Sequence, residues 1–404
     1  MSTTVITGIG VVAPNGLGTE AYWSATLAGT SGIAELTRFD ASAYPVRLAG
    51  EVPGFEPAEH LPSRLLPQTD HMTRLALAAA DWALKDADAD PAALGEYQAG
   101  VVTSATLGGF EFGQRELQHL WSQGPGFVSA YQSFAWFYAV NTGQISIRND
   151  LRGPSGVLVS DQAGGLDAMA HARRGIRKGH PMMVTGGVDS ALCPYAWTPR
   201  MGTGEMTTVA EADRAYLPFD ESASGYVAGE GGAILIAEDA ESARARGVGR
   251  PYGEIAGYGS TFDPPKGSDR PRGLARAIRL ALADAGLEPG RIDVVFADAD
   301  GRPEEDADEA AALNEVFGTG GVAVTAPKTM TGRLGAGAAP LDVAAALLSI
   351  RDGLVPPTVN LTNPRYGLDL VLGEARSMPV KAALVLARGR HGFNSAMVVR
   401  ACDW

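Results

Sequence analysis

The sequence predicts an α/β fold built from two similar halves, and three observations support this prediction. The chain has 404 residues, which corresponds to two or three units of about 150 residues. Its hydrophobic share of 45% and charged share of 20% are ordinary for a globular protein. The same order of strands and helices also occurs twice along the chain, which is typical of a duplicated unit. We expect halves at residues 1–251 and 252–404.

The first half alternates buried strands with helices of amphipathic spacing. It opens with the apolar run TVITGIGVVAP, and its helix near residue 80 has Leu75, Ala78, Ala79 and Trp82 at helical intervals. The strands are predicted at residues 3–13, 99–105, 181–191 and around 235, and the helices at 19–28, 72–86 and 110–121. Residues 133–154 read as an aromatic segment that becomes helical, and 155–179 as a strand, a sharp turn and a helix.

The second half repeats this order. Residues 253–263 echo the opening strand, and 273–301 predict a helix, a Gly-Pro loop and a strand. Residues 332–353 predict a small-residue turn that leads into a helix, as at 163–179. Two further strands, at 381–390 and 394–401, close the predicted sheet.

Composition excludes several classes of function. The net charge of −13 argues against nucleic acid or an anionic membrane as partner, since both attract a basic surface. Two cysteines, Cys193 and Cys402, exclude a disulfide framework and a Cys-rich metal site. No basic start followed by an apolar run, and no stretch of about 20 apolar residues, is present. We therefore expect a cytoplasmic protein without a metal site.

The common catalytic motifs are absent. The chain contains no GxxxxGK[ST], no HExxH and no GxSxG, which argues against a P-loop, a zincin site and a hydrolase nucleophile elbow. The partial GxG at TGIGVVAPNG is read as a Gly-rich turn, because Ala13 replaces the third glycine. His391 is the only histidine after residue 180, so no mechanism can take two histidines from the second half.

Four ordered stretches closely resemble the β-ketoacyl synthase family of the thiolase fold: VSDQAGGLDAMAHARRGIRKG, LPFDESASGYVAGEGGAILIAED, APKTMTGRLGAGAAPLDVAAAL and FNSAMVV. The resemblance implies two five-stranded mixed sheets packed in an αβαβα sandwich. In active members a nucleophilic Cys begins the helix where this chain has Gln162. A carboxamide cannot form an acyl-enzyme, and Cys193, which lies outside this motif, is expected to be a packing residue.

The resemblance also locates the positions of two catalytic histidines. Asp298 and Arg333 occupy them, while Lys328 and Glu309 are retained. No catalytic residue is therefore expected, and Asp298 is expected to repel a developing enolate. We expect Lys328 and Glu309 to form a structural pair with each other.

This combination resembles one subfamily, the chain length factors, or ketosynthase β subunits, of type II aromatic polyketide synthases. The resemblance implies a heterodimer with an active ketosynthase α subunit, and a substrate carried on the phosphopantetheine of an acyl carrier protein. No cofactor is expected on this chain itself. A local patch at Arg173, Arg174 and Arg177 is one candidate contact for the carrier protein.

In the subfamily, a tunnel at the heterodimer interface sets polyketide length. Phe110, Gly113 and Leu117 match the length-determining positions, and their spacing places them on one helix face. Gly113 leaves a gap, and Leu117 is smaller than an aromatic, so a long tunnel is expected. The aromatic segment Phe134, Trp136, Phe137 and Tyr138 is expected at the interface. Ordinary packing remains the alternative for both groups.

Two other functions stay open. Gln162 also stands in the Cys position of decarboxylating loading ketosynthases, so the chain is alternatively a malonyl-carrier decarboxylase that primes synthesis. Those enzymes keep both histidines, however. A self-sufficient homodimeric acyltransferase requires an unrecognised nucleophile.

Overall fold

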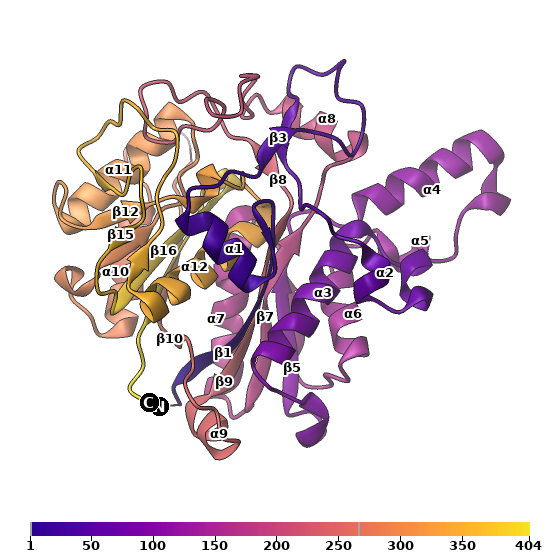
Figure 1. Ribbon diagram of the computed structural model, residues 1–404, viewed down its shortest axis with the longest axis horizontal. Coiled ribbons are helices and arrows are strands. Elements are labelled where there is room, and N and C mark those ends of the chain that lie inside the picture. Colours follow the sequence, from indigo (N-terminus) through magenta and orange to yellow (C-terminus); the bar gives the residue numbers. More distant parts are fainter. Residues whose placement is uncertain (1, 266) are drawn as a thin grey trace.

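The computed structural model describes residues 2–265 and 267–404 and contains two stacked sheets with helices between and outside them (Figure 1). The first-half sheet has the order β1 (Thr4–Ala13), β9 (Gly231–Asp239), β7 (Met182–Asp189), β5 (Ala99–Ser104) and β6 (Ser155–Leu158). β1, β9 and β7 pair antiparallel, whereas β7, β5 and β6 pair parallel. The sheet is therefore mixed, as predicted, and β6 forms its outer edge.

The second-half sheet follows the same plan. Its order is β10 (Gly253–Phe262), β17 (Phe393–Arg400), β16 (Ala382–Gly389), β11 (Val294–Phe296), β12 (Ala323–Thr325) and β14 (Asp369–Leu370). The first three strands are antiparallel and the rest parallel. The duplication is confirmed, with the two-residue β14 added to the five expected strands. The sheets also meet where Val5 and Ile6 of β1 pair with Glu254 and Gly253 of β10.

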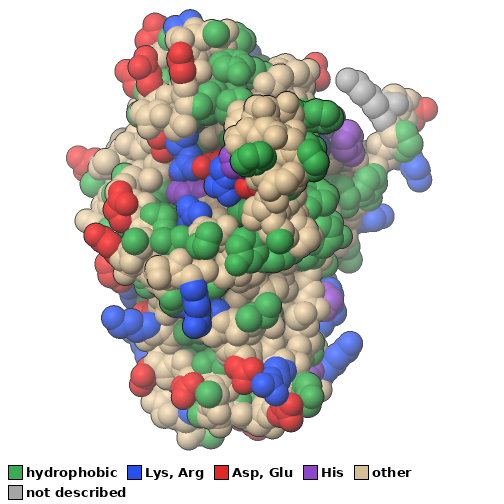
Figure 2. All heavy atoms as spheres, turned by 90° about the vertical axis from the view of Figure 1, so that its right-hand side faces the viewer, with side chains coloured by type: hydrophobic (Ala, Val, Ile, Leu, Met, Phe, Trp, Pro, Cys, Tyr) green, Lys and Arg blue, Asp and Glu red, His purple; other side chains and the backbone are tan. Residues whose placement is uncertain are grey.

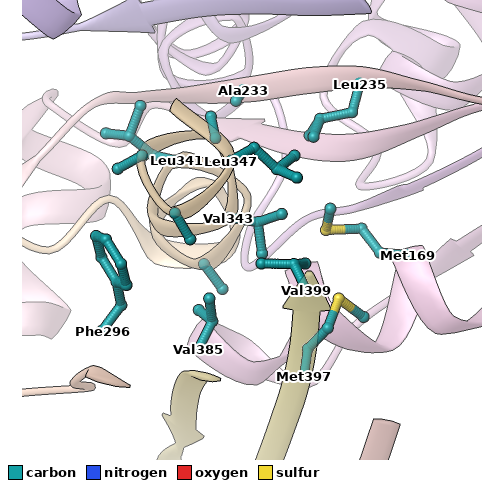
Figure 3. Packing of buried hydrophobic residues seen from close by; sticks show 14 of the residues in the cluster. Met169, Ala233, Leu235, Phe296, Leu341, Val343, Leu347, Val385, Met397 and Val399 are labelled. Carbon is teal, nitrogen blue, oxygen red and sulfur yellow. The ribbon is translucent and has the colours of Figure 1, made fainter. Parts of the chain in front are cut away.

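Three helical layers complete the sandwich. α3 (His71–Asp86) and α6 (Val140–Arg148) cover one outer face, and α10 (Leu274–Ala285) and α11 (Pro303–Phe317) the other (Figure 1). The middle layer contains α7 (Gly164–Arg177) and α12 (Ala338–Asp352). α12 is buried on all sides from Ala338 to Ile350, which explains why that stretch is apolar apart from Asp342 and Ser349. Residues of both sheets, such as Leu235 and Val399, surround α12 and α7 in the central core (Figure 3).

A glycine allows the two middle helices to approach closely. A Cβ on Gly165 of α7 would lie 2.2 Å from Cδ of Pro340 in α12. This contact is far inside van der Waals distance, so a side chain at this position would separate the helices. Their close approach positions the turn that precedes α7, which carries Gln162.

The remaining elements lie around this sandwich. They are α1 (Thr19–Leu27), α2 (Pro57–His60), α4 (Phe110–Gln123), α5 (Gln132–Ala135), α8 (Pro194–Gly202), α9 (Ala240–Ala245), β2 (Gly16–Leu17), a small sheet of β3 (Ile33–Glu35), β4 (Leu48–Gly50) and β8 (Ala228–Gly229), and the pair β13 (Leu354–Val355) and β15 (Arg376–Ser377). The small sheet, α8, α9 and α11 were not predicted from the sequence. α4 projects from the body of the molecule (Figure 1).

Candidate functional site

Gln162 lies in the turn that joins β6 to α7. The turn is a short 3₁₀ segment, Asp161–Ala163, and Asp161 has a φ of 53°, a region that non-glycine residues rarely adopt. The backbone N–H of Arg390 donates to Asp161 Oδ2 at 3.0 Å, which stabilises this conformation from the opposite half of the molecule. The sharp turn predicted from the sequence is thus present, and the residue within it, Gln162, carries a carboxamide that cannot form an acyl-enzyme.

Asp298 and Arg333, which the sequence analysis expected at the two histidine positions, form a buried ion pair. Both residues are 3% exposed. Arg333 Nη1 and Nη2 each lie 3.1 Å from Asp298 Oδ2, and Nη1 donates to the Asp298 carbonyl oxygen at 3.0 Å. The sequence predicted an Asp298 charge that would repel an enolate, and the structure adds that the guanidinium of Arg333 pairs with this carboxylate and neutralises it.

Gln162 joins this pair. The amide of Gln162 is assigned the orientation that satisfies both of its ends, with the nitrogen toward Gly335 and the oxygen toward Arg333. In this orientation the side chain donates to the Gly335 carbonyl oxygen at 3.0 Å and accepts from Arg333 Nε at 3.2 Å. The three residues that the sequence analysis placed at the expected catalytic positions are thus bonded to one another. We call Gln162, Asp298 and Arg333 the plug.

Further charges around Arg333 were not predicted from the sequence. Asp300 Oδ2 lies 3.6 Å from Arg333 Nη1, and the Tyr226 ring faces the guanidinium at 5.8 Å. Burial works to lower the pKa of Arg333, but the charges of Asp298 and Asp300 outweigh it and hold the pKa well above its usual value. Burial likewise works to raise the pKa of Asp300, but Arg333 outweighs it and lowers that pKa. The acidic residue two positions after Asp298, Asp300, is the sequence feature from which a second acidic partner of Arg333 could have been predicted.

Lys328 and Glu309 do not pair with each other, so that expectation is wrong. Lys328 Nζ lies 2.7 Å from Asp342 Oδ2 and donates to the carbonyl oxygen of Ala297. Glu309 instead accepts the backbone N–H groups of Asp298 at 2.7 Å and Ala299 at 2.8 Å. Both retained residues therefore hold the loop after β11, on which Asp298 lies.

The plug faces a large cavity. The cavity has a volume of about 1250 Å³, and Gln162, Asp298, Arg333 and Phe110 are among its lining residues. Its other charged side chains are arginines and acids in equal number, including Arg302 and Glu205, which pair at 3.1 Å. The lining therefore carries little net charge for a charged ligand.

The three predicted tunnel residues share α4 but face different surroundings. Phe110 lines the plug cavity and stacks on Tyr195 with ring centroids 5.2 Å apart. Leu117 lines a separate hollow of about 550 Å³ with Trp121 and Tyr195. A Cβ on Gly113 would lie 3.5 Å from Cβ of Trp136, so Gly113 faces the aromatic segment. The structure thus brings Gly113 and the predicted interface residues together.

The aromatic segment lies beside α4 and is largely exposed. Trp136, Phe137 and Tyr138 are exposed, and Phe134 is half-buried beside Tyr131. Figure 2 shows apolar side chains gathered on this side of the molecule. Exposed apolar side chains grouped in this way are typical of a contact site.

Other predicted groups can be placed. Cys193 is buried beside Ala196, and burial raises its pKa to about 11, so it is an un-ionised packing residue, as predicted. Arg173 is buried and pairs with Asp284, so only Arg174 and Arg177 of the expected basic patch lie at the surface. Within residues 2–265 and 267–404, no group of three His, Cys, Asp or Glu side chains could hold a metal ion. None of the helices described is long and apolar enough to span a membrane.

Comparisons with known proteins agree with this geometry. Family models described as "Beta-ketoacyl synthase, N-terminal domain" and "Beta-ketoacyl synthase, C-terminal domain" match residues 1–242 and 252–362. The "Actinorhodin polyketide putative beta-ketoacyl synthase 2" of Streptomyces coelicolor is 62% identical over 98% of each chain. The "Tetracenomycin polyketide synthase ketoacyl synthase beta subunit" of Streptomyces glaucescens is 60% identical, also over 98% of each chain.

Solved structures give the same result. The structure entitled "The ishigamide ketosynthase/chain length factor" superposes with a TM-score of 0.89 and 31% identity over the whole of both chains. A type II acyl carrier protein complex with its ketosynthase gives a TM-score of 0.88 at 26% identity, covering 99% of this chain and all of that one. The thiolase-like fold predicted from the sequence is therefore confirmed. The chain belongs to the β-ketoacyl synthase family, among the ketosynthase β subunits, or chain length factors, of type II polyketide synthases.

Proposed function

We propose that this chain is a non-catalytic subunit that pairs with an active ketosynthase and limits polyketide length through a tunnel at their interface. The observation that carries the proposal is the exposed apolar face formed by α4, the aromatic segment and the edge of the first sheet. Trp121 of α4 is 81% exposed, and Ile147 of α6, which packs beside β5 and β6, is 78% exposed. Because water disfavours such a surface, it needs a partner.

The edge strand β6 indicates that the interface lies on the same side of the molecule. In the part of the chain that the structure describes, β6 pairs only with β5, and Val159, just after β6, is exposed. An open strand edge offers backbone donors and acceptors to another chain. A partner that covers β6 and the aromatic segment removes both exposed features together.

The plug explains why the partner performs the condensations. The guanidinium of Arg333 is occupied by Asp298, and the amide of Gln162 is occupied by Arg333 and Gly335. An enolate needs donors that are free and aimed at it. The same occupancy argues against the decarboxylase alternative. We expect carbon dioxide release by the complex to be unchanged in Gln162→Ala, and loss of release would favour that alternative.

The acyl carrier protein brings the substrate on its phosphopantetheine, so we expect this chain to need no cofactor of its own. The growing chain, made by the partner, enters a tunnel beside α4, where Phe110, Gly113 and Leu117 lie. A reactive poly-β-keto chain is thereby shielded, and its extension stops where further atoms would overpack the tunnel.

Co-purification tests the proposal. The tagged chain is co-expressed with an untagged active ketosynthase from the same gene neighbourhood, and the native mass is measured. We expect a one-to-one heterodimer, in which Gly113→Phe shortens the polyketide. A homodimer that ignores the ketosynthase would remove the subunit role, and unchanged product length in an intact Gly113→Phe complex would remove Gly113 from the tunnel.

A further inference from the structure

The tunnel helix α4 is anchored at one end. Its buried residues are Phe112, Gly113 and Glu116, all within its first seven positions, while its C-terminal half projects away from the body (Figure 1). The direction of the helix therefore depends on the contacts of its first turns. Leu117, further along, has its position set by that anchor.

The start of α4 lacks a cap of its own. The N-cap position is Gly109, which makes no side-chain cap bond. A Cβ at Gly109 would lie 2.1 Å from the Ala135 carbonyl oxygen and 2.9 Å from Cβ of Asp70, so only glycine fits. The free N–H groups of a helix start need acceptors from elsewhere.

Asp70 supplies that acceptor from a different helix. Its Oδ1 accepts from Met72 N at 2.8 Å, as the N-cap of α3, and its Oδ2 accepts from Phe112 N at 2.7 Å in α4. The side chain is buried. One carboxylate therefore caps two helices and faces the positive ends of both.

The shared cap connects a rigid element to a projecting one. α3 packs along β1, β9 and β7, so it does not move independently of the sheet. Phe110 and Leu117 are seven residues apart, or about 10 Å along the helix axis. A tilt of roughly 10° at the cap would therefore move Leu117 by about 2 Å, close to the ~2.5 Å span of two carbon–carbon bonds of ~1.5 Å each.

We propose that Asp70 is a positioning residue for product length, because its carboxylate sets the direction of α4 and so the place of Leu117 in the tunnel. The inference rests on the proposed function of α4 as a tunnel wall. Other contacts help to hold the helix, such as the stacking of Phe110 on Tyr195 and the ion pair of Arg38 with Glu111. Asp70 differs in bonding directly to the backbone of α4 while it begins α3, which packs on the first-half sheet.

Asp70→Asn isolates the role of the second oxygen. An amide has one accepting oxygen and an NH₂ group, so it can cap α3 or α4 but not both. Asp70→Glu keeps two accepting oxygens. The matched control is Asp239→Asn, since Asp239 caps α9 through Ser242 N at 3.0 Å and does not touch α4.

The assay uses the reconstituted complex with its carrier protein at neutral pH and measures total malonyl consumption separately from the ratio of longer to shorter polyketides. We expect Asp70→Asn to change that ratio at least about threefold, a difference of under 1 kcal/mol, at nearly constant consumption. Asp70→Glu should lie nearer the wild type, and Asp239→Asn should not change the ratio.

The outcomes separate the two proposals. If Leu117→Phe shifts the ratio but Asp70→Asn does not, the role of Asp70 is wrong and the tunnel stands. If neither variant shifts the ratio, the tunnel proposal fails. If Asp70→Asn lowers consumption without changing the ratio, Asp70 is a purely structural residue.

Amide hydrogen exchange in the wild-type complex gives a second test that needs no variant. The N–H of Phe112 should exchange at least about tenfold more slowly than that of Glu111, one residue earlier in the same turn, because Asp70 holds it. Equal exchange rates would show that the cap bond is not made, and would overturn the proposal even if Asp70→Asn fails to fold.

Discussion

The buried ion pair of the plug predicts a large and specific loss of stability when one partner is removed. Asp298→Ala deletes the carboxylate that lies 3.1 Å from both terminal nitrogens of Arg333 and accepts Arg388 N at 2.9 Å. Arg333 then stays buried without its main counter-charge. Breaking such a pair costs about 3–5 kcal/mol.

This cost converts into a measurable shift in melting temperature. The entropy of unfolding is about 2.1 cal/mol/K per residue, so 404 residues give about 0.85 kcal/mol/K and a Tm lower by about 4–6 °C. Calorimetry on the purified chain measures the shift. The control is Glu315→Ala, which removes an exposed pair with Arg279 at 2.7 Å and should cost less than about 1 kcal/mol.

A double variant tests the reasoning itself. Asp298→Ala with Arg333→Met removes both charges and leaves an apolar side chain of similar length. We expect the double variant to regain at least about 2 kcal/mol over Asp298→Ala, because no charge remains buried alone. If the two changes simply add, the cost does not come from an uncompensated Arg333, and the account of the plug as a neutralised pair is refuted.

Three further predictions concern pH, packing and the interface. Burial raises the pKa of Asp70 to about 6 and of Asp306 and Glu309 to about 7, so the folded state binds more protons than the unfolded state between about pH 4 and 7. The free energy of unfolding should therefore fall by several kcal/mol as pH rises from 5 to 8, at about 1.4 kcal/mol per pH unit and group. Acids whose pKa is lowered change stability only below this pH range, and His171, whose pKa burial lowers, opposes the trend weakly. A Tm that rises with pH would contradict the prediction. Gly165→Ala should lower the free energy of unfolding by about 1–3 kcal/mol or more through its clash with Pro340, whereas Gly143→Ala, in open space on α6, should be neutral or stabilising in the same urea titration. Trp136→Asp should weaken the heterodimer at least about 30-fold, as expected for a Trp hot spot of about 2 kcal/mol, with Leu280→Asp on the opposite outer layer as control; equal affinities would place the interface elsewhere.

Local pattern predicted most of the fold. The run at 3–13 and the helical spacing at 72–86 correspond to β1 and α3 within one or two residues, because each pattern describes burial of its own segment. The small sheet of β3, β4 and β8 was missed, since strands of two or three residues are too short to show a period. Their pairing also joins segments about 180 residues apart, which periodicity does not report.

The residues of the site could be predicted from the sequence, but the groups to which they bond could not. The motifs located Gln162, Asp298 and Arg333, and the structure shows them bonded together. The partner of Lys328 was predicted wrongly because Asp342 lies inside an otherwise apolar helix. The sequence does not show which loop a single acidic residue of a buried helix faces. The shared cap of Asp70 joins two helices whose starts are about 40 residues apart, and was invisible for the same reason.

The contacts of the plug argue that it is a specified structural element. Random loss of a catalytic site would leave buried polar groups without partners, and each would cost about 1–3 kcal/mol. Here Gln162 accepts from Arg333 and donates to the Gly335 carbonyl oxygen, and the next residue, Ala336, donates its N–H to Asp189 at 2.9 Å and to Thr106 Oγ1 at 2.8 Å. Thr106 lies in the loop that leads from β5 into α4. The plug therefore joins the turn before α7 to the loop after β11, and through Gly335 and Ala336 it also supports the loop from which α4 begins. Under the proposed function, a substitution in the plug should therefore disturb the position of α4 as well as the plug itself.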